Sequence, residues 1–286
     1  MSRVIKELFK HDKRFSFGTT ILVLFIMIAL ISLFTPYNMK AWNTVPRDLP
    51  PSWEHPLGTN SMGQDILWKT MVAIKNSLLL GLIAASLSRM IAIVLGLLAG
   101  YKGGRFDRIV MTINDSFIII PLFPVLILIA SILRTSLSII VLGIIIGLFG
   151  WAWDARLFRS QILSLKEREF TKTAVLSGMK TSKIITTEHL PYIIPLILAA
   201  TINNVIWVIG MEVTLSMLGL SNLNTPTIGT MIYWALQYQA IFLEKWNWIL
   251  TPIIICILLI LALYMLSTSI SEYLDPRTRL QLIKKE

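Results

Sequence analysis

The chain has 286 residues, of which 55% are hydrophobic and 15% are charged, and its net charge is +10. A soluble domain carries about 25% charged residues, so this composition excludes a soluble globular protein. We expect an integral membrane protein whose positive charge reflects topology and contact with anionic lipid headgroups, and no binding of nucleic acid.

Charged residues leave six long stretches of the chain free, interrupted only by Arg89. The stretches are 15–39, 76–101, 116–133, 135–153, 189–211 and 246–271. Each approaches or exceeds the ~20 residues that a helix needs to cross ~30 Å of hydrocarbon. Helices satisfy their backbone hydrogen bonds internally, as lipid requires. The sequence therefore predicts an all-α membrane protein with six transmembrane helices.

Positively charged residues indicate the orientation, because Lys and Arg stay on the cytoplasmic side. With the N-terminus inside, 19 Lys and Arg fall in inner segments and six in outer segments. Both termini are therefore expected to be cytoplasmic. A seventh span within 213–243 is conceivable, but its Asn, Pro and Gln residues argue against it. We expect 229–243 to form an interfacial or partly re-entrant helix on the outer side.

The predicted organisation follows in chain order. Residues 1–16 form a cytoplasmic tail and 17–34 a first transmembrane anchor, too long and without the cleavage site of a signal peptide. An external segment, 35–75, contains too many prolines for one long helix. The transmembrane domain is expected to cover 76–272, and 273–286 to form the cytoplasmic C-terminal tail.

The longest cytoplasmic loop, 156–190, has a helical pattern of its own. Ser164 and Glu167 have the spacing of a capping box, which predicts a helix start there. Phe170 and Ala174 would share one face of that helix, and Gly178 could end it in a left-handed conformation. A second short helix is expected over 181–190. From these residues alone, a solvated positive loop remains an alternative.

Motifs for covalent chemistry do not stand out. The sequence has no GxxxxGK[ST] phosphate loop, HExxH, GxSxG or zinc-type cysteine spacing. We expect no catalytic residue, no metal site and no cofactor in this chain. The function classes that remain are transport, a channel or assembly.

The cytoplasmic loop resembles the coupling-loop motif of ABC importer permeases. The residues that fall on or beside the motif are Glu169, Phe170, Lys172, Thr173, Ala174, Gly178, Leu190 and Pro191. Lys172, Thr173 and Glu188 depart from its usual residues, whereas the spacing and the Ala, Gly, Leu and Pro agree.

Five further segments resemble the peptide-importer branch of that family, in the same order along the chain. They are 55–65, 97–104, 115–121, 212–220 and 275–277.

The resemblance implies the type I ABC importer permease fold and a multi-pass subunit of the cell membrane. It implies import of di- or oligopeptides, a second homologous permease, and an extracytoplasmic substrate-binding protein. It also implies two ATP-binding subunits that hold ATP and Mg. Relatives of this branch carry oligosaccharides or nickel chelates, which remain alternative cargoes. A secondary transporter or channel without an ATPase, and a membrane enzyme, are the rival classes.

Polar residues within the spans are the candidates for the pathway. They are Arg89, Asp115, Asn203, Asn204 and Glu212. Arg89 lies near the middle of its span, where an unpaired charge costs at least ~2.5–3.5 kcal/mol. We expect it either to pair with Asp115 or Glu212, to line the pathway, or to reach a headgroup layer.

Two outer segments, 40–75 and 216–245, are expected to face the binding protein. Anchoring of their aromatic side chains at the lipid headgroups is the alternative.

Overall fold

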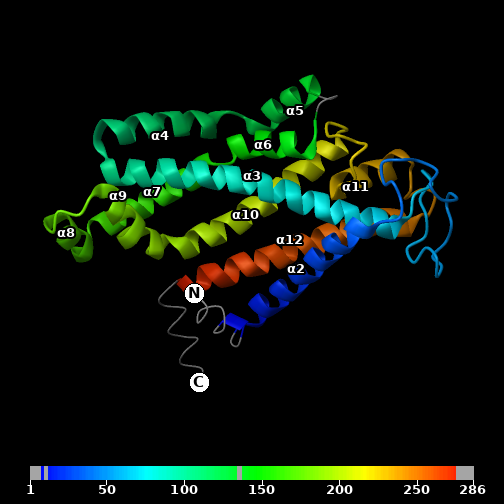
Figure 1. Cartoon of the computed structure of the whole chain (residues 1–286). Helices are drawn as coiled ribbons and strands as arrows, with labels where there is room; N and C mark the ends of the chain where they lie inside the picture. The colour runs from blue at the N-terminus through cyan, green and yellow to red at the C-terminus, as the bar shows by residue number, and fades with distance from the viewer. Residues whose placement is uncertain (1–7, 10–11, 134–136, 275–286) are drawn as a thin grey trace.

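The computed structural model describes residues 8–9, 12–133 and 137–274, and within these it is helical without a named strand. Figure 1 shows an elongated bundle in which α3 runs between α4 and α10. The elements are α2 (Lys13–Ile31), η1 (Ser32–Phe34), α3 (Ile66–Lys102), α4 (Gly104–Ile119), α5 (Leu122–Ile132), α6 (Ile139–Phe149), α7 (Ala152–Lys166), α8 (Glu169–Leu176), α9 (Thr181–Lys183), the π-helix η2 (Ile184–His189), α10 (Leu190–Met217), α11 (Ile228–Gln237) and α12 (Trp246–Leu274).

Four continuous helical segments are long and apolar enough to cross a membrane. They are Lys13–Phe34, Ile66–Lys102, Thr181–Met217 and Trp246–Tyr273. Two bent pairs, α4 with α5 and α6 with α7, pass the same test together. The structure is compatible with the six predicted spans when each bent pair is taken as one span.

The third and fourth spans are bent, and their helices extend beyond the predicted stretches 116–133 and 135–153. The axes of α4 and α5 differ by 76° at Pro121, and those of α6 and α7 by 45° near Gly150. Pro121 lacks a backbone N–H and disfavours helical geometry at Ile120, whose ψ is 125°. Arg134, expected between these spans on the outer side, lies outside the described residues.

Sequence signals at both ends of α3 explain its bounds. The Asp65 side chain accepts a hydrogen bond from the backbone N–H of Trp68 at 2.9 Å and caps the helix start. Gly103 and Gly104 have φ of +66° and +59°, and this turn ends the helix. The helix begins at Ile66, so the last ten residues of the predicted external segment are helical.

Glycines allow α3 to lie directly against its neighbours. A Cβ added to Gly96 would come within 2.6 Å of the carbonyl oxygen of Ala155, and one added to Gly100 within 2.8 Å of that of Arg159. On α6, a Cβ at Gly147 would lie 2.8 Å from the carbonyl oxygen of Ala84. Such small residues are typical of helix contacts in membranes. They join α3, α6 and α7 into one closely packed unit.

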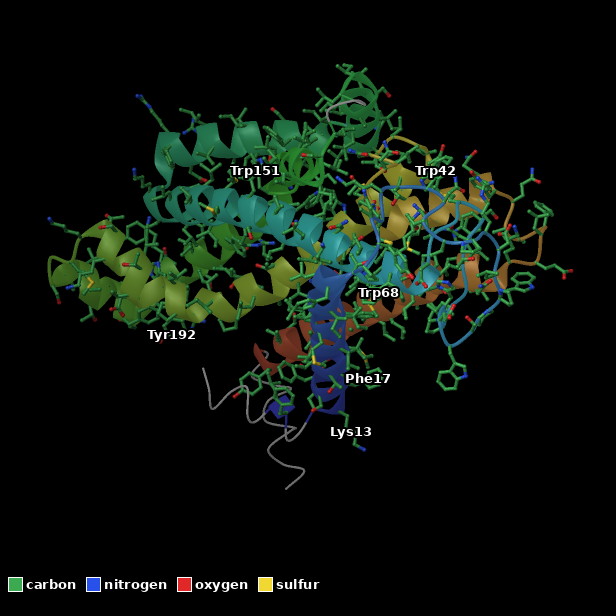
Figure 2. All side chains as sticks on the ribbon, turned by 45° about the vertical axis from the view of Figure 1, so that its right-hand side comes forward. Lys13, Phe17, Trp42, Trp68, Trp151 and Tyr192 are labelled. Atoms are coloured by element: carbon green, nitrogen blue, oxygen red, sulfur yellow. The ribbon has the colours of Figure 1, made fainter. Side chains whose placement is uncertain are left out.

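The bundle has two distinct ends. In Figure 1, α8 and α9 lie at one end, and α11 lies at the other end beside the long segment between η1 and α3. Figure 2 shows Trp42 and Trp68 near the α11 end and Tyr192 near α8. The helix expected over 229–243 is confirmed over Ile228–Gln237, where Thr227 and Thr230 form a capping box.

Candidate functional site

A cavity of about 280 Å³ opens between helices at the level of the two bends. Its walls come from the end of α4, the start of α5, the junction of α6 and α7, and the middle of α10. The lining residues are Phe117, Ile118, Ile120, Leu122, Phe149, Gly150, Ala152, Trp153, Asp154, Ala200, Asn203, Asn204 and Trp207. The cavity therefore lies where the third and fourth spans are bent.

Arg89 lies behind this cavity and pairs with Asp154. Its Nη1 is 2.9 Å from Oδ2 of Asp154, and its Nη2 donates to the carbonyl oxygen of Ala200 at 2.8 Å. The guanidinium also lies 5.4 Å from the ring centre of Phe158. These contacts compensate the burial of Arg89, which is 5% exposed. The structure supports the expected ion pair but changes the partner.

The two asparagines of α10 are at the cavity, as the sequence suggested for pathway residues. Asn203 is exposed there. Asn204 is buried and donates from Nδ2 to the carbonyl oxygen of Gly150 at 3.3 Å. Its Oδ1 has no hydrogen-bond partner within the described part of the chain.

The other two pathway candidates lie elsewhere, and neither pairs with Arg89. Asp115 accepts from Arg156 Nη2 at 2.5 Å, and both side chains are exposed. Glu212 is buried and accepts on Oε1 from Ser216 at 2.6 Å and from Thr227 at 2.5 Å, which joins α10 to the start of α11. The prediction that Arg89 pairs with Asp115 or Glu212 is wrong, because both carboxylates have nearer partners.

Sequence reasoning missed Asp154 and the aromatic residues of the cavity. Asp154 marked only the end of a charge-free stretch, and nothing in its immediate neighbours points to Arg89. An available signal was that Arg89, inside a span, needs an acidic partner at similar depth. Asp154 directly follows the predicted span 135–153, so the sequence placed it at the end of a span and not at the depth of Arg89.

The helix α8 is fastened to the ends of three longer helices. The buried hydroxyl of Thr171 is 2.8 Å from the carbonyl oxygen of Leu165, at the end of α7, and 2.9 Å from Nε2 of His189. His189 in turn lies beside the ring of Tyr101, near the end of α3. Phe170 stacks on Tyr192 of α10 at a centroid distance of 5.3 Å. A displacement of α8 would therefore be transmitted to α3, α7 and α10.

The apolar face shared by Phe170 and Ala174 is turned toward this chain. Ala174 is 7% exposed and Phe170 is half-buried, so both pack against this chain itself. The outward face instead presents Leu176, which is 88% exposed, Val175, which is 53% exposed, and Lys172. Phe170 and Ala174 do share a face, but that face holds α8 in place.

The local geometry of this loop differs from the sequence prediction in two further places. Ser164 lies inside α7, which ends at Lys166, so the predicted capping box does not start a helix. The buried side chains of Phe158 and Ile162 keep α7 helical past Ser164. The second short helix is not separate either, because α9, η2 and α10 follow without a break through Leu190 and Pro191.

Gly178 has the conformation that its place in the motif predicted. Its φ is +74°, and an added Cβ would find no atom within 4 Å. A side chain there would be opposed by backbone strain alone, not by crowding.

Polar contacts hold the segment between η1 and α3 together and join it to the start of α12. His55 Nδ1 lies 2.6 Å from Oδ2 of Asp65, and Lys245 lies 2.8 Å from Oδ1 of Asp48. Burial raises the pKa of Asp48, but hydrogen bonds from Lys245 and Ser61 outweigh it and leave that pKa below its usual value. Asn60 is buried, so it is not part of an exposed surface.

Within the described residues, no group of three His, Cys, Asp or Glu side chains is arranged to hold a metal ion. The lining of the cavity includes one carboxylate, two side-chain amides and four aromatic side chains.

Comparison with known proteins gives a consistent result. Residues 92–280 match the family model described as binding-protein-dependent transport system inner membrane component. The oligopeptide transport system permease protein OppC of Bacillus subtilis is 33% identical over 213 residues, which cover 74% of this chain and 69% of that relative. OppC of Mycobacterium tuberculosis is 28% identical over 96% of this chain and 94% of its own length. The nickel transport system permease protein NikC of Escherichia coli is 31% identical over 89% of this chain and 92% of its own.

Proposed function

Since the chain belongs to the family of binding-protein-dependent transport system inner membrane components, we propose that it forms half of the pathway of a peptide importer driven by ATP. The cargo class is taken from the OppC relatives, which are oligopeptide transport system permease proteins. A nickel complex is the second candidate, favoured by the similarity to NikC. A second homologous permease would supply the other half of the pathway.

One observation supports coupling best: α8 is attached to two of the helices that wall the cavity. Thr171 contacts Leu165 at the end of α7, and Phe170 stacks on Tyr192 of α10. The start of α7 and the middle of α10 line the cavity. An ATP-binding subunit that moves α8 would thus move both walls. This arrangement suits alternating access, in which cargo sites open to one side at a time.

The partners in this proposal are two ATP-binding subunits, which carry ATP and Mg, and an extracytoplasmic substrate-binding protein. The outward face of α8, with Leu176 and Val175, would contact an ATP-binding subunit as a short helix in a groove. The end that carries α11 and segment 35–65 would face the binding protein. Both chain termini would then be cytoplasmic, on the side of α8.

The test uses the complex reconstituted in proteoliposomes. The isolated chain should not hydrolyse ATP, whereas the complex should hydrolyse it faster when peptide-loaded binding protein is added. Hydrolysis by the purified chain alone would refute the proposal. If a nickel-loaded binding protein stimulates ATP hydrolysis and a peptide-loaded one does not, the second candidate is selected.

A substitution at Gly178 tests the coupling helix. Gly178→Val should leave the chain in the membrane but reduce the peptide transported per ATP, because valine opposes the positive φ. Gly178→Asn is the matched control, since asparagine tolerates that conformation. Equal transport per ATP in both variants and in the unmodified chain would refute the role of this turn.

A further inference from the structure

The cavity offers one ionisable side chain. Of the described residues that line it, Asp154 is the single Asp, Glu, Lys, Arg or His. The side chain of Asp154 is 18% exposed, whereas that of Arg89 is 6% exposed and lies outside the lining. The negative partner of the ion pair therefore faces the cavity, and the positive partner lies behind it.

The ion pair with Arg89 leaves hydrogen-bond acceptor sites of the Asp154 carboxylate free. The structure shows one contact, from Nη1 of Arg89 to Oδ2 of Asp154. A carboxylate has about four lone-pair sites, and no second donor to Asp154 is found in the described part of the chain. Contacts with Ala200 and Phe158 fix Arg89 in turn. Asp154 is thus oriented and can still accept further hydrogen bonds.

The remaining surface of the cavity suits a cation attached to an apolar group. Four aromatic rings line it, those of Phe117, Phe149, Trp153 and Trp207. The faces of aromatic rings attract cations, with Trp the strongest. A carboxylate with such rings disfavours an anion and fits an ammonium group whose hydrocarbon neighbour packs on the rings.

We infer that Asp154, positioned by Arg89, is a recognition site within the pathway for a primary ammonium group of the cargo. The ammonium donates to the free oxygen of Asp154, and the adjoining hydrocarbon packs on Trp153 and Trp207. This inference rests on the proposed function and specifies which part of a peptide the chain contacts. The ammonium could belong to the peptide N-terminus or to a lysine side chain, which offer the same chemistry.

The experiment measures binding in the cavity without binding protein or ATP hydrolysis. In the assembled transporter, native Cys256 is replaced by serine and Asn203→Cys provides an exposed thiol on the cavity wall. Protection of this thiol from a maleimide is titrated with a tripeptide that has a free N-terminus and with its N-acetylated form. The free peptide should protect at roughly tenfold lower concentration, the low end for a hydrogen bond to a charged group, because Arg89 already offsets part of the charge.

Variants of the ion pair distinguish a role of Asp154 in cargo recognition from a purely structural role. The double change Arg89→Gln and Asp154→Asn keeps a hydrogen-bonding pair without charge, and it should abolish the tenfold difference. The matched control is Asp107→Asn with Arg159→Gln. It neutralises a different ion pair, which joins α4 to α7 and lies away from the cavity lining. In that pair, Nη2 of Arg159 is 2.6 Å from Oδ2 of Asp107. This control should retain the difference.

A third peptide, N-acetylated and with one lysine, identifies the source of the ammonium. If this peptide protects the thiol as strongly as the free peptide does, the site accepts any primary ammonium group. If it protects more weakly, the site recognises the N-terminus. For peptides without lysine, equal protection by the free and the acetylated form would overturn the inference. This holds in the chain that carries only Cys256→Ser and Asn203→Cys, whether or not the double variant assembles. The inference would also be overturned if Ni²⁺ protects the thiol and none of the peptides does. The proposed function fails separately, if no loaded binding protein stimulates ATP hydrolysis.

Discussion

The contact between Thr171 and His189 gives a direct test of how α8 is held. Thr171 is 1% exposed and His189 is fully buried. Thr171→Val keeps the shape of the side chain but removes the hydroxyl that lies 2.9 Å from Nε2 of His189. The carbonyl oxygen of Leu165 would still accept from the backbone N–H of Arg168. The imidazole would lose its one described hydrogen bond, since Nδ1 has none among the described residues.

A buried polar group left without a partner costs about 1–3 kcal/mol, which shifts the equilibrium between attached and detached α8 by roughly 5- to 150-fold. We therefore expect faster hydrogen exchange in α8 and less peptide transported per ATP in proteoliposomes. Thr173→Val is the control on the same helix, because its exposed hydroxyl bonds only the carbonyl oxygen of Glu169. If Thr171→Val and Thr173→Val give the same exchange and the same transport per ATP, the attachment described for α8 is wrong.

Three further outcomes follow from the exposed and buried groups. Leu176→Asp should change the free energy of unfolding by no more than ~0.5 kcal/mol. It should weaken binding of an ATP-binding subunit ten- to hundredfold, because the burial of a leucine in the interface is lost. Unchanged affinity in a pull-down titration would contradict this prediction. In a chain without its native cysteine, Trp53→Cys should react with an impermeant thiol reagent from outside and Ser177→Cys only from inside; the reverse pattern would invert the topology. Arg89→Ala should reduce assembly, because breaking a buried pair costs about 3–5 kcal/mol, and adding Asp154→Asn should restore it; no recovery on gel filtration would argue against a structural pair.

The sequence was sufficient for features that depend on local physics. Charge-free stretches placed the helices that could span a membrane, and Gly178 adopts the left-handed conformation expected of it. The bends were not predicted, because hydropathy alone registers 116–133 as one apolar stretch. Pro121 carried the signal for the sharper bend, since proline disfavours helical geometry at the preceding residue.

Features that depend on which surfaces meet in space could not be predicted in the same way. The spacing of Phe170 and Ala174 correctly gave one apolar face, but spacing does not distinguish packing within the chain from docking to a partner. The need of Arg89 for a partner was predictable, yet its identity was not. Asp154 reaches it only because the glycines of α3 allow α7 to approach closely.

The separation of Arg89 and Asp154 along the chain has a consequence for biogenesis. Ribosomes add about 5–20 residues per second, so Asp154, which is 65 positions later, is synthesised roughly 3–13 seconds after Arg89. During that interval the second span carries an unpaired guanidinium, at a cost of ~2.5–3.5 kcal/mol on insertion scales. The apolar residues of this span must offset that cost until α7 is made. The free energy of Arg89 in the membrane therefore depends on a helix that is synthesised two spans later.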